Sequence, residues 1–396
     1  MDTTASQKTN ILYVGNDSLL PVERPEVLPI YPSTANIIMD MDDYDRANKG
    51  EKYYYCRTAN PNRDSVAQAV SYLENGEQSL ICSSGMAAIS TTILSIIQAG
   101  DHIITSNAIY GETIELFDRI VKKFDVSISY VDLTDSTAIA AAIRPETRLI
   151  YTEIITNPLI RIIDIDAVVR LAHQSGILVV VDSTFTTPFA IRPLDHGADI
   201  VVHSMTKYFG GHSDITAGCI TGPKKLMKKI YSDWLLFGGC LDPQSSWLLL
   251  RSIRTMEMRV TRQFENARTL AEALQDDPHV HYVNYPTLAN HPQHNLAKEL
   301  FPNGCGAMLS FRVEDDREKV NQFIHKLKTV KYLGTLGGYR TTIAHPATAF
   351  RLDFTPEQLH EMGMEEGLIR ISSGIESAAD LISDFKQALS VFDSVK

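Results

Sequence analysis

Short runs of apolar and β-branched residues recur between about residues 65 and 225, and the stretches between them carry apolar residues at helical spacing. Several runs are apolar throughout, as expected for strands that are covered on both faces. Strands that alternate with helices in this way are typical of an α/β fold, a mostly parallel sheet with helices on both faces. We predict seven strands, at residues 79–82, 102–106, 126–131, 148–154, 178–183, 200–204 and 218–221.

The chain on either side of this region has a different pattern. Residues 245–274 form a long stretch with apolar residues at helical spacing, which predicts a helix leading into a smaller α+β domain. The first 60 residues lack periodicity and hold several prolines between residues 21 and 32 and a cluster of tyrosines. We predict an arm over residues 1–62, a large domain over 63–257 and a C-terminal α+β domain over 258–396, with strands at 307–311 and 368–372 and a helix at 381–391.

The composition is that of an ordinary globular protein. Hydrophobic residues make up 44% and charged residues 21% of the 396 residues, and no apolar run approaches the ~20 residues of a membrane helix. The N-terminus lacks the basic start and apolar stretch of a secretory signal, so we expect a cytoplasmic protein. The net charge of -11 disfavours nucleic acid and membrane as partners and favours a small-molecule substrate. Five scattered cysteines without a CxxC pair argue against a disulfide framework and a structural zinc site.

The first candidate for chemistry is Lys207, within the segment HSMTKYFGGHSD at residues 203–214. This segment follows a predicted strand, and open parallel sheets bind ligands beyond the carboxyl ends of their strands. We expect Ser204, Thr206 and Lys207 to project into that crevice, where a lysine amine can form a Schiff base. The alternative for a lone lysine is a solvated surface position.

Asp182 ends another predicted buried strand, where an unpaired carboxylate would be strongly destabilising. It needs a cationic partner, and the protonated nitrogen of a pyridine ring is one. A helix N-cap or a structural ion pair is the alternative.

A third feature is an expected helix start at Ser84, Gly85 and Met86, where free backbone N–H groups form an anion site. The hydroxyls of Ser204 and Thr206 would complete a phosphate cradle there. The alternative is a capped helix with no ligand.

Seven segments follow one another in this order: YYYCRTANP, SSGM, AIYGET, TEIITNP, VDSTFTTP, HSMTKYFGGHSD and LIRISSGIE. Together they resemble the family of cystathionine γ-synthase, cystathionine γ-lyase and methionine γ-lyase, over roughly residues 20–392. The resemblance implies a pyridoxal-phosphate enzyme of cysteine and methionine metabolism. It also implies fold type I, the aspartate aminotransferase-like fold, and a homotetramer built as a dimer of dimers.

The resemblance also implies roles for single residues. Lys207 would be the Schiff-base lysine and the base that moves protons between Cα, Cβ and the cofactor, and Asp182 would hold the pyridine nitrogen. Tyr110 would stack on the ring and act as acid or base at the leaving group; its alternative is a buried aromatic residue. The phosphate would be held by Ser84, Gly85, Met86, Ser204 and Thr206.

Four more residues match positions of the family. Tyr55 and Arg57 match residues that reach into a neighbouring subunit and bind its phosphate. Asn157 matches an asparagine near the cofactor's 3-hydroxyl. Arg370 matches the arginine that binds the substrate α-carboxylate through two parallel hydrogen bonds.

The sequence departs from the family where substrate choice is made. Ser183 stands in place of an asparagine. Glu112 stands where methionine γ-lyases typically carry Cys and the synthases Gly, and Arg340 replaces a glutamate of cystathionine-handling members. Ala349 and Phe350 replace a Thr-His pair.

Three arrangements of the two charged residues stay open. If Glu112 faces the pocket, it favours a cationic side chain such as that of canavanine. If Arg340 faces it instead, an anionic acyl group is favoured. In the third arrangement the two pair with each other or face solvent.

The reaction that the resemblance implies is γ-elimination. The γ-substituent leaves through a vinylglycine-type intermediate, and 2-oxobutyrate and ammonia or a related product are released. The alternative is γ-replacement, in which a thiol or another nucleophile captures the same intermediate, as in cystathionine γ-synthase or O-acylhomoserine sulfhydrylase. A non-catalytic protein on this fold is the third hypothesis, and the intact set of Lys207, Asp182, Tyr110 and Arg370 argues against it.

Overall fold

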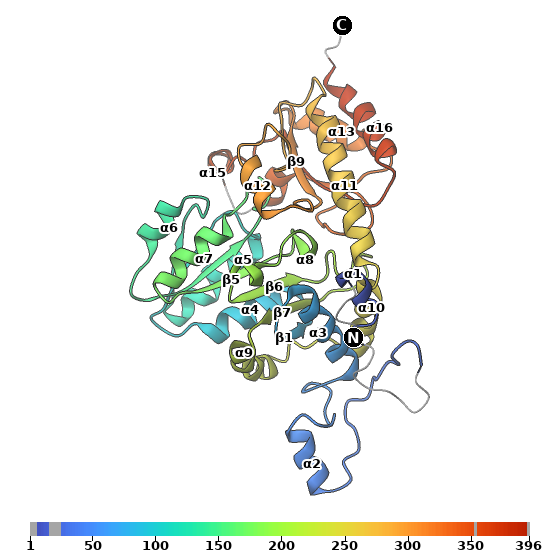
Figure 1. The fold of residues 1–396 in the computed structure, drawn as a ribbon. Helices are drawn as coiled ribbons and strands as arrows, with labels where there is room; N and C mark the ends of the chain where they lie inside the picture. Colours follow the sequence, from blue (N-terminus) through green and yellow to red (C-terminus); the bar gives the residue numbers. More distant parts are fainter. Residues whose placement is uncertain (1–5, 16–24, 352–354, 394–396) are drawn as a thin grey trace.

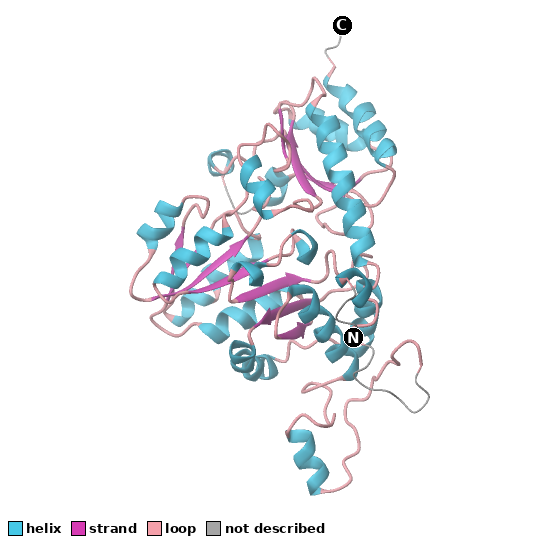
Figure 2. Cartoon of the chain, viewed as in Figure 1, coloured by secondary structure: helices cyan, strands magenta, loops and turns pink. Residues whose placement is uncertain are grey.

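The computed structural model describes residues 6–15, 25–351 and 355–393. Its larger body is built on one sheet in the order β1-β7-β6-β5-β4-β2-β3 (Figures 1 and 2). All neighbours are parallel except β7, which is antiparallel to both β1 and β6. The strands are β1 (Gln78–Cys82), β2 (His102–Thr105), β3 (Ser127–Tyr130), β4 (Thr147–Glu153), β5 (Leu178–Asp182), β6 (Ile200–Ser204) and β7 (Gly218–Gly222). The seven predicted strands are therefore confirmed.

Helices cover both faces of this sheet, which explains why its central strands are apolar throughout. In β5, Val179 and Val181 pack into one hydrophobic core and Val180 into the other, because successive side chains of a strand point to opposite faces. The first core is covered by α3 (Pro61–Glu74), α7 (Ile165–Gln174) and α10 (Pro243–Ile253), and the second by α4 (Gly85–Ile96) and α9 (Lys224–Phe237).

Shorter elements complete the larger body. They are α5 (Gly111–Arg119), η1 (Val121–Phe124), α6 (Ser136–Ala142), α8 (Thr187–Ala190) and η2 (Pro193–His196). Of these, α5 matters most here, because it starts beside the carboxyl end of β4: the backbone N–H of Tyr110 donates to Glu153 Oε1 at 2.7 Å.

The prediction of one long helix over residues 245–274 was wrong. The structure has two helices, α10 and α11 (Met256–Gln275), with a break at Arg254 and Thr255. The guanidinium of Arg254 donates to the carbonyls of Ile11 and Val14 in the arm. The carbonyl of Ser252, which a continuous helix offers to residue 256, instead accepts from Arg259 Nη2 at 2.9 Å. The break therefore coincides with side-chain contacts of Arg254 to the distant arm and of Arg259 to the end of the first helix.

The C-terminal part carries a second sheet of five strands in the order β10-β11-β12-β9-β8. The predicted strands are present as β9 (Met308–Arg312) and β12 (Leu368–Ser372), joined by β8 (Tyr282–Asn284), β10 (Lys331–Tyr332) and β11 (Thr342–Ala344). The predicted terminal helix is α16 (Ala378–Leu389), followed by η3 (Ser390–Phe392). The other helices are α12 (His294–Leu300), α13 (Arg317–Lys326), α14 (Pro346–Phe350) and α15 (Pro356–Glu361).

The N-terminal arm is only partly described, since residues 1–5 and 16–24, which include Pro21, lie outside the described ranges. Its first helix, α1 (Gln7–Asn10), leads into Ile11 and Val14, which are buried against the chain's own body. The second, α2 (Met41–Asn48), stands away from both sheets (Figure 1). Within the described ranges, no helix combines the length and apolarity that crossing a membrane requires.

Candidate active site

The predicted site residues meet in a cavity of about 310 Å³ at the carboxyl ends of β4, β5 and β6. The starts of α4 and α5 border it, and β12 of the C-terminal sheet closes it. The predicted residues that line it are Ser84, Gly85, Met86, Tyr110, Glu112, Asn157, Asp182, Ser204, Thr206, Lys207 and Arg370. Tyr55, Arg57 and Arg340 do not line it.

Lys207 lies largely inside this cavity and is not a solvated surface lysine. Its Nζ donates to Thr335 Oγ1 at 3.4 Å. Burial, and then the positive charge of Arg370, lower the pKa of Lys207, while the carboxylate of Glu112 opposes them. The neutral amine, the form of a lysine that can act as a nucleophile or a base, is therefore reached at lower pH than for an exposed lysine.

Asp182 is buried at the end of β5, in register with Glu153 on β4. Its carboxylate accepts hydrogen bonds from the Thr184 N–H at 2.9 Å and from the Tyr151 hydroxyl at 3.4 Å. Burial raises the pKa of Asp182, and burial together with Asp182 raises the pKa of Glu153. Asp182 is not the N-cap of α8, which is Thr186, and it forms no ion pair within the described residues.

The start of α4 lies against the loop that carries Lys207. Ser84 is the N-cap, and its hydroxyl accepts from the Ala87 N–H at 3.0 Å. The N–H groups of Gly85 and Met86 have no acceptor among the described residues, because the first N–H groups of a helix lack a partner within the helix and the Ser84 cap satisfies only that of Ala87. Only a glycine fits at position 85, because an added Cβ would lie 2.8 Å from Ser204 Cβ.

Thr206 borders the same site, but its Oγ1 donates to the carbonyl of Ala217 at 3.2 Å and accepts from the Ala217 N–H at 3.0 Å. Ser204 is held by its backbone, whose N–H donates to Thr184 Oγ1 at 2.8 Å. The two hydroxyls therefore differ in how free they are to bind an anion.

These features fit the pyridoxal phosphate that the resemblance implies. Asp182 is a buried carboxylate without a cationic partner in the described chain, as a protonated ring nitrogen requires. The unsatisfied N–H groups at the start of α4 suit a phosphate. Lys207 lies between them in the same cavity.

Tyr110 stands at the N-terminus of α5 and is 41% exposed, so it is not the buried aromatic residue of the alternative. Burial of its hydroxyl, and then the charge and hydrogen bond of Glu112, raise the pKa of Tyr110 to about 12. Its hydroxyl therefore stays protonated near neutral pH and can donate a proton.

Arg370, on β12, reaches from the C-terminal sheet into the cavity. Its Nη1 donates to Asn157 Oδ1 at 2.8 Å. Burial lowers the pKa of Arg370, while the nearby Tyr208 and Glu153 oppose it. The guanidinium is thus fixed at one end and turned toward the cavity that also holds Lys207.

Glu112 and Arg340 lie in different places. Glu112 lines the cavity, and its carboxylate acts on both Tyr110 and Lys207. Arg340 is exposed, with its guanidinium 5.0 Å from the centre of the Tyr339 ring. No ion pair joins the two within the described ranges. Of the three arrangements, the structure has the one in which the acidic residue borders the cavity.

A second cavity of about 630 Å³ adjoins the first and shares Tyr110, Glu112 and Arg370 with it. Ala349 and Phe350, two of the departures from the family, line this second cavity. Ser183 does not line either one: it is buried, with its hydroxyl 2.6 Å from that of Thr186.

Tyr55 and Arg57 lie away from both cavities of their own chain. Arg57 Nη1 donates to the carbonyl of Leu235 at 2.9 Å, and its guanidinium lies 5.6 Å from the centre of the Tyr55 ring.

Several residues at the site were not predicted from sequence. Thr335 bonds Lys207, Thr184 bonds both Asp182 and Ser204, and Tyr151 bonds Asp182. Single threonines in a long chain carry no signal of such a role, although Thr184 lies inside the VDSTFTTP segment. In the described part of the chain, no group of three or more His, Cys, Asp or Glu side chains is placed to hold a metal ion.

The chain is similar to known proteins over nearly its whole length. The chain matches the family of Cys/Met metabolism PLP-dependent enzymes over residues 9–390. It is 40% identical to the cystathionine γ-lyase of Bacillus subtilis over 345 residues, which are 87% of this chain and 90% of that protein. It is 37% identical to the L-methionine γ-lyase of Pseudomonas putida, over 92% of each chain.

Solved structures are similar over the whole chain. Cystathionine γ-lyase from Lactobacillus plantarum, in complex with L-serine, has a TM-score of 0.89 at 32% identity and covers 98% of this chain and 99% of its own. A Campylobacter jejuni protein described as a putative O-acetylhomoserine (thiol)-lyase, solved with a pyridoxyl-lysine phosphate, has a TM-score of 0.91 at 30% identity and covers 98% of this chain and 100% of its own. The predicted fold type I architecture is confirmed. The chain belongs to the family of pyridoxal-phosphate-dependent enzymes of cysteine and methionine metabolism, with pyridoxal phosphate as its cofactor.

Proposed function

We propose that this enzyme catalyses γ-elimination on a γ-substituted L-homoserine-type amino acid. The observation that carries the proposal is the convergence of Lys207, Asp182, Tyr110 and Arg370 in one cavity. The similarity to cystathionine γ-lyase and L-methionine γ-lyase supports the reaction class. The products would be 2-oxobutyrate, ammonia and the protonated leaving group, with one water consumed.

Each residue has a separate task in this proposal. When bound, pyridoxal phosphate supplies an electron sink for carbanions beside the substrate amino group. Lys207 holds the cofactor and, as a neutral amine, takes protons from Cα and Cβ of the substrate. Asp182 holds the ring nitrogen in its protonated form, and the start of α4 binds the phosphate.

The substrate is positioned from two sides. Arg370 binds the α-carboxylate, because a guanidinium already fixed by Asn157 offers its remaining donors in a fork that matches a carboxylate. Tyr110, whose hydroxyl has a pKa of about 12, donates a proton to the departing γ-substituent.

Glu112 is the residue that would select the γ-substituent. It borders both cavities and has no cationic side chain as an ion-pair partner among the described residues. A carboxylate at such a position favours a leaving group with positive charge or several N–H donors. Canavanine, whose γ-oxygen carries a guanidinium, is the substrate we propose, ahead of methionine and cystathionine.

A second candidate is γ-replacement, in which a thiol adds to the carbon chain after the γ-substituent has left. The similarity to the Campylobacter jejuni O-acetylhomoserine (thiol)-lyase, at a TM-score of 0.91, favours keeping it. We propose that a thiol would enter through the second cavity, which shares Tyr110, Glu112 and Arg370 with the first.

We also propose that the active enzyme is a dimer of dimers with shared sites. Tyr55 and Arg57, which lie outside the cavities of their own chain, would bind the phosphate in a neighbouring subunit. The arm that carries them exposes large apolar side chains: Ile37 is 88%, Met39 79% and Met41 86% exposed. Apolar side chains gathered on one segment are typical of an interface.

A substrate panel tests the proposal. Purified enzyme loaded with cofactor is given canavanine, methionine, cystathionine and O-acetylhomoserine, each with and without a thiol, and 2-oxoacid and amino-acid products are measured. The proposal expects 2-oxobutyrate from canavanine in the absence of thiol. Thioether products formed only with thiol would favour replacement, and no product from any substrate would reject both.

A further inference from the structure

Phe350, the last residue of α14, forms part of the wall of the second cavity. It shares that cavity with Tyr110, Glu112 and Arg370, the residues assigned above to the leaving group and the α-carboxylate. Its ring lies against the start of α5: a Cβ added to Gly111 would come within 3.2 Å of Phe350 Cε1. An aromatic ring therefore occupies space next to the residues that meet the γ-substituent.

The backbone places Phe350 there through β11 and β12. Ala344, at the end of β11, is paired with Arg370 on β12. The chain then turns into α14, whose N-cap is His345 and whose first residue is Pro346. Ala344 precedes the N-cap of α14 by one residue and lies beside Arg370 in the sheet. The length of α14 therefore sets the distance between Arg370, which would bind the α-carboxylate, and the Phe350 ring.

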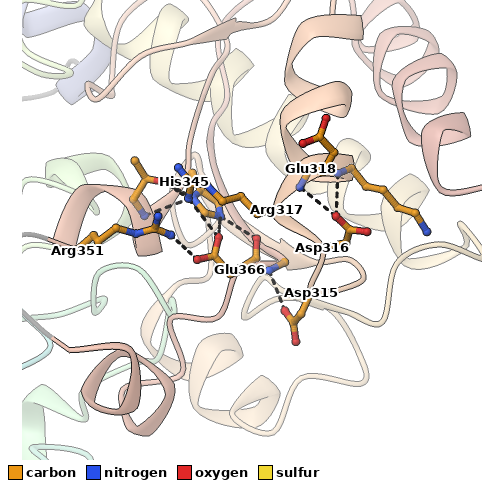
Figure 3. A network of polar contacts seen from close by, with 10 residues as sticks. Asp315, Asp316, Arg317, Glu318, His345, Arg351 and Glu366 are labelled. Atoms are coloured by element: carbon orange, nitrogen blue, oxygen red, sulfur yellow. Dashed lines mark hydrogen bonds and ion pairs between the residues drawn. The ribbon is translucent and has the colours of Figure 1, made fainter.

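That helix is held by a group of side chains that we call the cap cluster: Arg317, His345, Thr348, Arg351 and Glu366 (Figure 3). His345 is 4% exposed, and its two ring nitrogens have different partners. Nε2 lies 2.7 Å from the carbonyl of Glu366, and Nδ1 lies 2.7 Å from Thr348 Oγ1 and also accepts from the Thr348 N–H. A neutral imidazole that donates from Nε2 and accepts at Nδ1 satisfies all of these contacts.

Charged residues surround this cap. Arg317 Nη1 donates to Thr348 Oγ1 at 3.1 Å and to Glu366 Oε2 at 3.3 Å, and Arg351 pairs with the same carboxylate. Burial lowers the pKa of His345, which favours the neutral form that the contacts require. Three parts of the chain therefore hold α14: Arg317 at the start of α13, Glu366 in the loop before β12, and Arg351 directly after α14 itself. These are more side-chain contacts than a five-residue surface helix needs.

We propose that Phe350 is a specificity-determining residue that limits the size of the γ-substituent, and that His345 is the positioning residue that holds it. This inference rests on the proposed function, since it concerns the leaving-group side of the same site. Neither residue touches the atoms that react. Their effect is on which substrates fit.

The test uses a series of S-alkyl homocysteines with methyl, ethyl, propyl and benzyl groups on the loaded enzyme. For Phe350→Ala we expect kcat/KM for the benzyl compound to rise at least ten-fold relative to the methyl compound, because the space of the ring becomes available. Phe350→Leu, which keeps an apolar side chain, should change the ratio less. Phe124→Ala, which removes an exposed ring outside both cavities, is the matched control and should not change it.

His345 is tested separately by a conservative pair. His345→Ala removes both cap contacts, so we expect the preference to broaden in the same direction as for Phe350→Ala, through lower KM for the bulky compounds with kcat for the methyl compound retained. His345→Asn restores an N-cap acceptor for Thr348 and should return most of the discrimination. A purely structural role would lower kcat for every substrate equally and would not distinguish the two variants.

The change in cofactor absorbance on substrate binding separates this inference from the proposed function. If neither canavanine nor any compound of the series is turned over, the proposed function fails, but the dissociation constants of the series still report the size limit. The inference is overturned if Phe350→Ala changes the affinities of the methyl and benzyl compounds by the same factor.

Discussion

Arg370 Nη1 donates a hydrogen bond of 2.8 Å to Asn157 Oδ1, and this bond joins the two sheets of the molecule at the active site. Arg370 lies on β12 of the C-terminal sheet, and Asn157 follows β4 of the large sheet. The site is therefore assembled only when both parts of the chain have folded and packed together. The predictions that follow depend on that assembly.

Replacing Arg370 by lysine keeps the charge but removes the planar fork. We expect Arg370→Lys to raise KM for the amino-acid substrate by roughly ten-fold to a hundred-fold, about 1.5–3 kcal/mol for charge-assisted hydrogen bonds, with a smaller effect on kcat. Steady-state kinetics measure this. Arg340→Lys, at an exposed arginine outside the cavity, is the matched control, and an equal effect in both variants would contradict the assignment.

Glu112 should contact the γ-substituent and determine which substrates are preferred. We expect Glu112→Gln to lower kcat/KM for canavanine by roughly ten-fold to a hundred-fold, because a charge-assisted contact of about 1.5–3 kcal/mol is lost, and to change methionine turnover much less. Glu272→Gln, at an exposed carboxylate that lies outside both cavities and beside Arg268, controls for the loss of a surface charge. Equal losses on canavanine and methionine would show that Glu112 does not contact the γ-substituent.

Asp182 should lower the stability of the cofactor-free protein and strengthen the binding of the cofactor. Burial raises the pKa of Asp182 in the folded state. Below its ordinary pKa of 3.8 the carboxyl is protonated in both the folded and the unfolded state, so it does not change the free energy of unfolding. As pH rises above that value, the unfolded state ionises first and the folded state becomes less stable relative to it. We expect Asp182→Asn to stabilise the cofactor-free protein by ~1–2 kcal/mol at neutral pH and not at acidic pH, and to weaken cofactor binding more than ten-fold.

Thermal unfolding of both proteins with and without cofactor, between pH 4 and 8, measures this exchange. Asp118→Asn, at an exposed carboxylate, controls for the loss of a surface charge. A lower midpoint for cofactor-free Asp182→Asn at neutral pH would mean that the carboxylate has a cationic partner in the protein.

Shared active sites can be tested by mixing two inactive variants. Arg57→Ala removes the proposed phosphate contact to the neighbouring subunit, and Lys207→Ala removes the proposed cofactor lysine. In a mixed dimer, one of the two sites has both residues intact, so we expect activity to return to as much as about a quarter of the wild-type level when subunits exchange at random. Exchange verified by native mass spectrometry without any return of activity would contradict sites shared across an interface.

The sheet of the large domain could be predicted from sequence because its strands are covered on both faces. The run Leu178–Asp182 is apolar until its last residue. The apolar residues indicate a buried strand, and Asp182 stands out as the one charged residue whose burial needs an explanation. The break after α10 could not be predicted, because hydrophobic spacing does not reveal the side-chain contacts found there. Arg254 bonds the carbonyl of Val14 in the arm, and Arg259 bonds the carbonyl of Ser252.

The site could be predicted only where motifs carry it. The resemblance placed Lys207, Asp182 and Tyr110 in one cavity, and the position of Glu112 two residues after Tyr110 favoured a place beside it. The sequence around Arg340 did not indicate that its guanidinium lies over the Tyr339 ring at the surface. Thr335 and His345 act through the packing of the C-terminal sheet, which no local motif encodes.

The most direct test of the account is to find where the cofactor is attached. The loaded enzyme is reduced with borohydride, digested and mapped by mass spectrometry, with Lys207→Ala as the control. We expect the pyridoxyl group on Lys207 alone and no label in the variant. A pyridoxyl group on any other lysine of the wild-type enzyme would contradict the site described here.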